Sequence, residues 1–311
     1  MSAFSAPGKL FLIGEYAVLH GGTAVVAAVD RRAVARFVPG AQPATPLIAE
    51  AVNVLAAYAR ERDLRLPDGA PLVDSSALSQ DGQKLGLGSS AAALVAAMGA
   101  LWDVLGQADG TLPLELAVKA HRQAQGGRGS GGDVAAALRG GVIAYARPGQ
   151  ADQAVRSLPV DLPAQLVVFR AGDPAATVQF LHAVERLEAR DPARYAAHVK
   201  PIAEAAARFA HAYEAGDCGG LLASVAAAHE ALQALGNAAD VPIVTPALQT
   251  AAALARGCGG AAKGSGAGGG DVGIGFFPDR DAADAFRARA AKLDLEILSI
   301  TTGARGLARD G

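Results

Sequence analysis

The chain has 311 residues, of which 51% are hydrophobic and 19% are charged, and its formal net charge is −2. This composition is typical of a globular protein with one large domain or two smaller ones, and it excludes a disordered chain. A net charge so close to zero gives no indication of nucleic acid or an anionic membrane as a partner.

No segment of the sequence indicates secretion or membrane insertion. The N-terminal residues lack the charged start and apolar stretch of a signal peptide, and the longest apolar run, around residues 91–102, is too short to span a bilayer. Cys218 and Cys258 form neither a disulfide framework nor a zinc-ligand pattern, which favours buried thiols in a reducing compartment. We therefore expect a cytoplasmic protein.

The first half of the chain is predicted to mix strands and helices. Strands are predicted for short apolar segments, residues 9–13, 24–29 and 142–145. Helices are predicted where apolar residues recur at helical spacing, at 48–62, from a cap at Ser89 or Ser90, and at 113–125. The polar, proline-bearing segment 152–163 suggests a boundary, so we expect domains at 1–160 and 161–311.

The second half is predicted to contain more helix. Strands are predicted at 166–169, 272–277 and 295–300. Helices are predicted at 175–190, 193–215 and 219–235, from the Thr245-Pro246 start, and from about Asp281. Both halves therefore belong to the α+β class.

Glycines concentrate in four places, residues 8–22, 86–88, 126–141 and 257–275. Glycine permits backbone conformations with positive φ and lets a backbone approach a ligand closely. Four such clusters, far apart in sequence, suggest loops that converge on one site. Four ordinary turns are the alternative.

The most informative stretch is Lys84-Leu85-Gly86-Leu87-Gly88-Ser89-Ser90-Ala91-Ala92. Here a glycine-rich loop opens directly into a helix, and the free N–H groups and positive dipole of a helix start can bind phosphate. The two serine hydroxyls could contact phosphate oxygens or Mg²⁺. The stretch is neither a Walker A motif nor a dinucleotide fingerprint, and the alternative is a glycine turn with a serine cap.

A second stretch, Gly129-Ser130-Gly131-Gly132-Asp133-Val134-Ala135, places an acid behind glycines at a helix start. Asp133 could act as a general base toward an acceptor oxygen, or could be an ordinary helix cap. Ser130 and Arg128 could hold a substrate phosphate, with a solvated loop arginine as the alternative for Arg128.

Two charged residues near the N-terminus are further candidates. Lys9 lies between apolar neighbours on a predicted strand, so it needs an anionic partner or access to water. It could stabilise charge on a transferred group, or simply extend into solvent. Glu15 could pair with a cation in the site or complete a turn.

The third stretch is Lys263-Gly264-Ser265-Gly266-Ala267-Gly268-Gly269-Gly270-Asp271, in which five of nine residues are glycine. This composition favours a loop that packs its backbone against a ligand, through Ser265, Gly266, Ala267 and Gly268. A purely structural turn is the alternative. The six histidines form no metal-ligand cluster, and all except His20 are expected to be surface or core residues.

These stretches, together with residues 6–19, resemble the ordered motifs of the GHMP kinases. Gly-Leu-Gly-Ser-Ser-Ala-Ala at 86–92 is similar to the phosphate loop of that family, although the usual preceding proline is absent. Lys84 before the loop, Gly-Ser-Gly-x-Asp-Val-Ala at 129–135, and the ending Gly-Gly-Gly-Asp resemble the phosphomevalonate kinases within it. The resemblance implies a two-domain α+β fold with the active site in the interdomain cleft.

The same resemblance implies roles for particular residues. ATP is expected to bind one loop, Gly86, Leu87, Gly88, Ser89, Ser90 and Ala91. Mg²⁺ is expected near Ser90 and Glu15, and Lys9 and Asp133 are expected to be catalytic.

The implied acceptor is a small molecule, phosphomevalonate, which is converted to the diphosphate on the mevalonate route to isoprenoids. An acceptor that already carries a phosphate needs cations, and the candidates are Lys9, Lys84, Arg128 and Arg170. After the strand at 166–169, phosphomevalonate kinases often carry Trp-Thr-Gly-Lys, whereas here Asp173 takes the lysine position and Arg170 could supply the charge.

Three alternatives stay open. A mevalonate kinase or another GHMP small-molecule kinase would carry the same motifs. A non-catalytic GHMP-fold binding or regulatory protein is a different class, against which the presence of both Lys9 and Asp133 argues. A nicotinamide dehydrogenase is suggested only by glycine loops and lacks the third fingerprint glycine.

Overall fold

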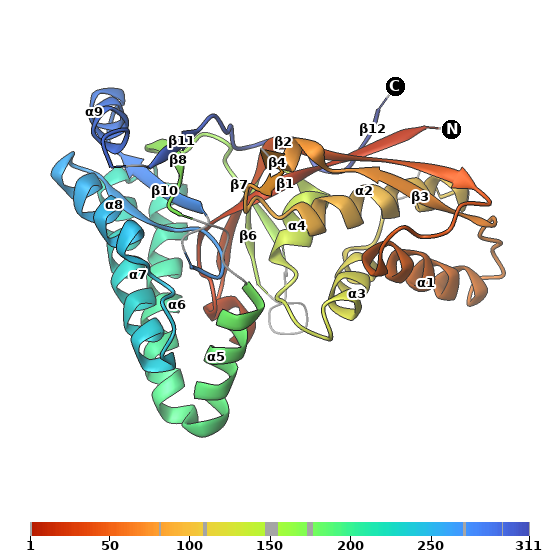
Figure 1. Cartoon of the computed structure of the whole chain (residues 1–311), viewed down its shortest axis with the longest axis horizontal. Coiled ribbons are helices and arrows are strands. Elements are labelled where there is room, and N and C mark those ends of the chain that lie inside the picture. Colours follow the sequence, from red (N-terminus) through yellow and green to blue (C-terminus); the bar gives the residue numbers. More distant parts are fainter. Residues whose placement is uncertain are drawn as a thin grey trace. The chain divides into compact units, whose positions relative to one another are not determined.

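The structure is a computed structural model that describes residues 2–80, 82–107, 111–146, 155–172, 177–269, 272–293 and 295–310 (Figure 1). Two compact units are formed by the chain. Unit 1 contains residues 1–10, 27–143 and 301–311, and unit 2 contains residues 11–26 and 144–300. These units are discontinuous in sequence and differ from the two continuous domains expected from the sequence. The domains 1–160 and 161–311 stay a prediction.

The larger sheet contains six strands among the described residues, in the order β12-β1-β2-β6-β7 with β3 paired to β2. Their bounds are β1 Ala3–Ile13, β2 Ala24–Pro39, β3 Gly69–Asp74, β6 Val142–Tyr145, β7 Val155–Leu158 and β12 Ala308–Asp310. β1 pairs antiparallel with β12, and β2 pairs antiparallel with β3. The first and last strands of the chain are therefore neighbours.

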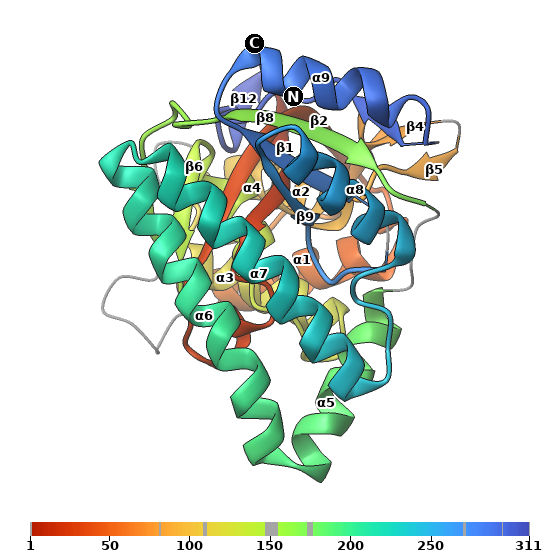
Figure 2. The same ribbon diagram turned by 90° about the vertical axis from the view of Figure 1, so that its left-hand side faces the viewer.

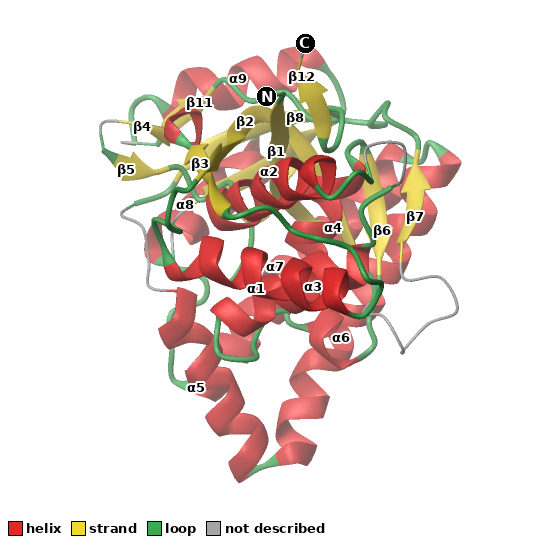
Figure 3. Cartoon of the chain, turned by 90° about the vertical axis from the view of Figure 1, so that its right-hand side faces the viewer, coloured by secondary structure: helices red, strands yellow, loops and turns green. Residues whose placement is uncertain are grey.

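Unit 1 adds four helices, α1 Pro46–Arg60, α2 Ser89–Val104, α3 Leu114–Ala124 and α4 Gly132–Arg139. α2 is in contact with each of the other three, and α3 also contacts α4 (Figure 3). Most of α2 is buried because its residues are apolar on almost every face, which is typical of a central helix. Shorter elements are η1 Ala17–His20, η2 Ser76–Leu78, β4 Ser79–Gln80 and β5 Gln83–Lys84.

Unit 2 is built on an antiparallel sheet of order β11-β8-β10-β9. These strands are β8 Gln165–Arg170, β9 Ala261–Gly264, β10 Val272–Phe277 and β11 Glu296–Leu298. Its helices are α5 Thr177–Arg190, α6 Pro192–Ala215, α7 Cys218–Ala239, α8 Pro246–Gly257 and α9 Arg280–Ala290. Figure 2 shows α6 and α7 as a long packed pair. Phe286 fills the core with ring contacts to Phe169 and Phe277, with centroids 5.6 and 5.0 Å away.

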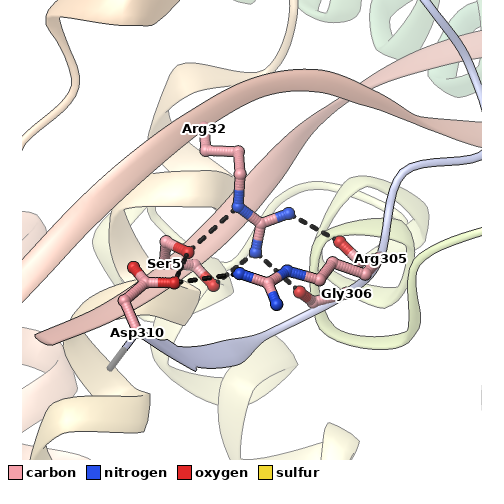
Figure 4. Close-up of polar contacts among 5 residues, drawn as sticks. All are labelled: Ser5, Arg32, Arg305, Gly306 and Asp310. Carbon is pink, nitrogen blue, oxygen red and sulfur yellow. Dashed lines mark hydrogen bonds and ion pairs between the residues drawn. The ribbon is translucent and has the colours of Figure 1, made fainter.

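The C-terminal segment is held in unit 1 by one arginine (Figure 4). Arg32 donates to the carbonyl oxygens of Arg305 and Gly306 at 2.7 and 2.8 Å, and to the carbonyl oxygen of Ser5 at 2.8 Å. The hydroxyl of Ser5 donates to Asp310 at 2.9 Å. A single side chain thus joins the first strand, the second strand and the last segment of the chain.

Most predicted elements are confirmed, often with longer bounds. The predicted cap at Ser89 or Ser90 is wrong, because Gly88 takes the cap position of α2 in the left-handed conformation and Ser89 is already helical. β3, β4, β5, β7, β9 and β12 were not predicted from the sequence. None of the helices in the described part of the chain is long and apolar enough to cross a bilayer.

Candidate active site

The phosphate-loop candidate is packed against Lys9 in unit 1. The backbone N–H of Lys9 donates to the carbonyl oxygen of Leu87 at 2.8 Å, and its Nζ lies 3.5 Å from the carbonyl oxygen of Gly86. A Cβ at Gly88 would lie 2.8 Å from Cγ and Cε of Lys9, and φ there is +74°. Glycine is therefore required at position 88 both by the backbone conformation and by the lysine stem beside it.

The predicted loop residues differ in what they expose. Leu87 and Ala91 are buried, so they can offer a ligand only backbone groups. Ser89 and Ser90 are partly exposed in the first turn of α2, where N–H groups have no partner within the helix. Lys84 is exposed on β5. The loop thus presents hydroxyl and N–H donors, which suit phosphate oxygens.

One imidazole lies between this loop and the predicted base. His121 on α3 is 2% exposed, with Nε2 at 3.3 Å from Oγ of Ser90 and Nδ1 at 3.9 Å from Oδ2 of Asp133. Nε2 also lies 3.2 Å from the amide nitrogen of Gln125. Two sequence candidates from α2 and α4 are therefore neighbours of the same side chain.

Asp133 lies in the first turn of α4 but is not its cap, since Gly131 takes that position. Its Oδ1 accepts the N–H of Val134 at 2.9 Å, and its side chain is 23% exposed. The simple cap alternative for Asp133 is wrong. The hydroxyl of Ser130 is buried and accepts the N–H of Gly132 at 3.2 Å, whereas Arg128 is exposed on the same loop.

In unit 2, Glu15 forms a buried ion pair with Lys263. Nζ of Lys263 lies 2.5 Å from Oε1 of Glu15 and 2.6 Å from the carbonyl oxygen of Gly264. Burial lowers the pKa of Lys263, and the charge and hydrogen bond of Glu15 oppose this shift. Glu15 is thus the partner of an internal cation through Oε1, and its role as a Mg²⁺ ligand stays a prediction.

The third glycine-rich loop is fixed by the same part of unit 2. The N–H of Gly266 donates to Oε1 of Glu15 at 3.2 Å, and the hydroxyl of Tyr16 donates to the carbonyl oxygen of Ala267 at 2.5 Å. A Cβ at Gly268, where φ is +92°, would lie 2.5 Å from the carbonyl oxygen of Ile243. This loop is therefore held by backbone contacts that larger residues would disrupt.

The remaining candidates of unit 2 differ in their surroundings. Ser265 is buried, and its N–H donates to the carbonyl oxygen of Val272 at 2.8 Å. Arg170 on β8 is 18% exposed and forms an ion pair with Glu296 of β11 at 3.4 Å. Asp173 and Asp271, also named from the sequence, lie outside the described residues.

Family models match both halves of the chain. Residues 47–141 match the N-terminal domain of the GHMP kinases, and residues 215–293 match their C-terminal domain. A phosphomevalonate kinase from Streptomyces sp. (strain CL190) is 30% identical, covering 91% of this chain and 92% of its own. The chain belongs to the GHMP kinases. A mevalonate kinase from Aeropyrum pernix is also 30% identical to this GHMP kinase, over 88% of each chain.

A solved structure supports the same fold. Streptococcus pneumoniae phosphomevalonate kinase in complex with phosphomevalonate and AMPPNP superimposes on this GHMP kinase with a TM-score of 0.82. The match covers 97% of this chain and 100% of that chain at 20% identity. The two-domain α+β fold that the motifs predicted is thereby confirmed.

Two residues of this GHMP kinase escaped the sequence reasoning, although signals for one were present. Residues 114, 117, 118 and 121 follow a helical repeat, and all four are buried on α3. His121 therefore falls on an apolar face, where a polar side chain needs partners. Lys263 begins the third glycine-rich stretch and had no role assigned from the sequence above, and the structure places it in the ion pair with Glu15.

Proposed function

We propose that the chain is an ATP-dependent kinase that transfers the γ-phosphoryl group of ATP to phosphomevalonate and forms the diphosphate. The single observation that carries this proposal is that Ser90 of the phosphate loop and Asp133 contact the same imidazole. The phosphate loop and the candidate catalytic base are thus neighbours within unit 1. Similarity to the phosphomevalonate kinase of Streptomyces supports the choice of acceptor.

The loop from Gly86 to Ala91 is proposed to bind the phosphates of ATP. Its backbone N–H groups and the hydroxyls of Ser89 and Ser90 are the donors. The described residues contain no cluster of three or more His, Cys, Asp or Glu side chains placed to hold a metal ion. This fits Mg²⁺, which is commonly bound through one or two protein groups plus substrate phosphates, and Ser90 would contribute its hydroxyl. The ion would neutralise charge on the phosphates.

Lys9 and Asp133 are proposed to act on the reacting groups. A phosphate oxygen of the acceptor bonds to the γ-phosphorus, the bond from that phosphorus to the bridging oxygen breaks, and ADP leaves. Lys9 beside the loop offsets negative charge on the transferred group. The Asp133 carboxylate, 23% exposed at the start of α4, orients the acceptor and can take a proton from it.

Cations and loop groups are proposed to hold the phosphate already present on the acceptor. Lys9, Lys84 and Arg128 are the candidates in unit 1, together with the Ser130 hydroxyl. In unit 2 the predicted contacts are Arg170 and the loop from Ser265 to Gly268. A location in the cytoplasm stays a prediction from the sequence.

The decisive experiment is steady-state turnover at saturating Mg·ATP with phosphomevalonate, mevalonate, homoserine and galactose as acceptors. We expect phosphomevalonate to give the highest kcat/KM, because mevalonate lacks the phosphate that the cations recognise. A mevalonate kinase is the second candidate, favoured by the relative from Aeropyrum pernix. A preference for mevalonate would overturn the acceptor and leave the kinase. Binding of ATP without turnover of any acceptor would favour a regulatory protein.

A further inference from the structure

His121 is a buried histidine with three polar neighbours, and the catalytic roles above leave it without a function. It lies on the apolar face of α3, where its side chain is 2% exposed. Burying an imidazole costs free energy unless it is hydrogen-bonded. If this face of α3 had only a packing role, leucine at position 121 would give a more stable protein than histidine. The polar neighbours Ser90, Gln125 and Asp133 are what the imidazole contacts instead.

The neighbours determine where the proton of the imidazole lies. The amide nitrogen of Gln125, 3.2 Å from Nε2, can only donate, so Nε2 accepts. The single proton of a neutral imidazole then lies on Nδ1. Nδ1 is the atom that faces Oδ2 of Asp133, at 3.9 Å. This distance exceeds that of a hydrogen bond, and catalytic hydrogen bonds are often long before substrates bind.

The same tautomer orients the hydroxyl of Ser90. With Nε2 as an acceptor 3.3 Å away, the Ser90 hydroxyl donates a hydrogen bond to its lone pair, which Ser90 shares with the Gln125 amide. Its oxygen lone pairs then point away from the imidazole and are available to a cation on the ATP phosphates. A hydroxyl that binds a cation uses these lone pairs. Hydrogen-bond partners on the far side of a metal-binding group are known to orient that group in this way.

We propose that His121 is a positioning residue that couples the two halves of the transfer site. Through Nε2 it orients the Ser90 hydroxyl toward the nucleotide, and through Nδ1–H it orients the Asp133 carboxylate toward the acceptor. This inference rests on the proposed function, because the two oriented groups have the roles assigned there. A purely structural role would not separate the two nitrogens. The proposed role predicts that Nε2 affects nucleotide affinity and that Nδ1 affects kcat.

Two conservative variants separate the nitrogens. In His121→Asn, the amide nitrogen replaces Nδ1, because both are attached to Cγ, and nothing replaces Nε2. In His121→Gln, the amide oxygen replaces Nε2 and can still accept from Ser90 and Gln125. We expect His121→Asn to weaken nucleotide binding and retain most of kcat. We expect His121→Gln to retain nucleotide affinity and lower kcat.

His121→Phe removes both contacts and should lower kcat/KM by about 10- to 100-fold, the range usual for groups that orient a ligand. Val118→Ala is the matched control, because Val118 is buried on the same helix and carries no polar side-chain atom. It should lower the melting temperature and leave kcat and KM unchanged. Each variant is measured by steady-state kinetics with the best acceptor, by thermal unfolding, and by calorimetry with a non-hydrolysable ATP analogue.

The proposal would be overturned if the Asn and Gln variants lost kcat and nucleotide affinity equally and in proportion to their loss of stability. Parental kinetics in both would also overturn it. Calorimetry needs no acceptor, so the contrast in nucleotide affinity tests the inference even if the parent prefers another substrate. An acceptor panel without turnover would count against the proposed function, and the affinities of the Asn and Gln variants would still decide the role of Nε2.

Discussion

Lys263 places its ammonium nitrogen 2.5 Å from Oε1 of Glu15, although 248 positions separate the two residues. Neither side chain is more than 3% exposed. Oε1 also accepts the N–H of Gly266, so the pair joins the first motif of the chain to the third glycine-rich loop. Removing one partner would leave the other charge buried in a medium of low dielectric.

Lys263→Met should therefore destabilise the protein by about 3–5 kcal/mol, the cost usual for breaking a buried pair. The measurement is the free energy of unfolding from urea denaturation. The double variant Glu15→Gln/Lys263→Met is the control, because it removes both charges and the introduced amide oxygen can still accept the N–H of Gly266. It should recover part of the loss, and strictly additive destabilisation would contradict the coupling.

Gly88→Ala tests the contact between the phosphate loop and Lys9. The new Cβ would meet the lysine stem at 2.8 Å, so Lys9 must move and nucleotide affinity should fall several-fold. Gly82→Ala is a matched control, because φ is +77° there and nothing lies within 4 Å of its Cβ. Both variants should lose about 1–2 kcal/mol of stability from backbone strain. Equal nucleotide affinity in both would show that the steric contact has no effect.

The sequence could predict the parts of the site that depend on local chemistry. The glycines before α2 and the acid at the start of α4 can be recognised because a glycine-rich loop and a helix start are local features of the sequence. The partners of His121 could not be predicted in this way. Its spacing on α3 places it on a buried face, but its contacts with Ser90 and Asp133 depend on how α2, α3 and α4 pack. The Lys263 pair likewise joins positions too distant for any local pattern.

Asp133→Asn should lower kcat by about 100-fold or more, the scale of general-base contributions, and leave nucleotide affinity within about 3-fold. Asparagine keeps the size of the side chain and an oxygen for the N–H of Val134, so stability should change little. Asp279→Asn, at the cap of α9, is the control for the same exchange at another helix start. A kcat close to that of the parent would remove Asp133 from catalysis.

Arg32→Ala should loosen the C-terminal segment. The guanidinium donates to three carbonyl oxygens and to the hydroxyl of Ser5, and their loss should cost about 2–4 kcal/mol. Arg36→Ala, an exposed arginine on the same strand, should change stability by no more than about 0.5 kcal/mol. Hydrogen exchange of residues 305–310 measures the effect directly. Unchanged protection there would mean that β12 is held by its strand pairing alone.

Arg128 and Arg170 were equivalent as sequence candidates for the acceptor phosphate, and the structure separates them. Arg128 is exposed on the loop that leads to Ser130 and Asp133. Arg170 is only 18% exposed and forms an ion pair with Glu296 on the neighbouring strand.

Arg128→Ala should raise KM for phosphomevalonate more than KM for ATP, because the loss of this cation weakens binding of the acceptor phosphate. Arg170→Ala should act mainly on stability, since it leaves Glu296 without this partner. Both variants are measured with phosphomevalonate and ATP varied in turn, alongside thermal unfolding. A mevalonate reaction in the Arg128 variant provides the internal control, because a lost phosphate contact cannot affect an acceptor without phosphate. If KM for phosphomevalonate rises more in the Arg170 variant, the acceptor phosphate is bound in unit 2 rather than beside Asp133.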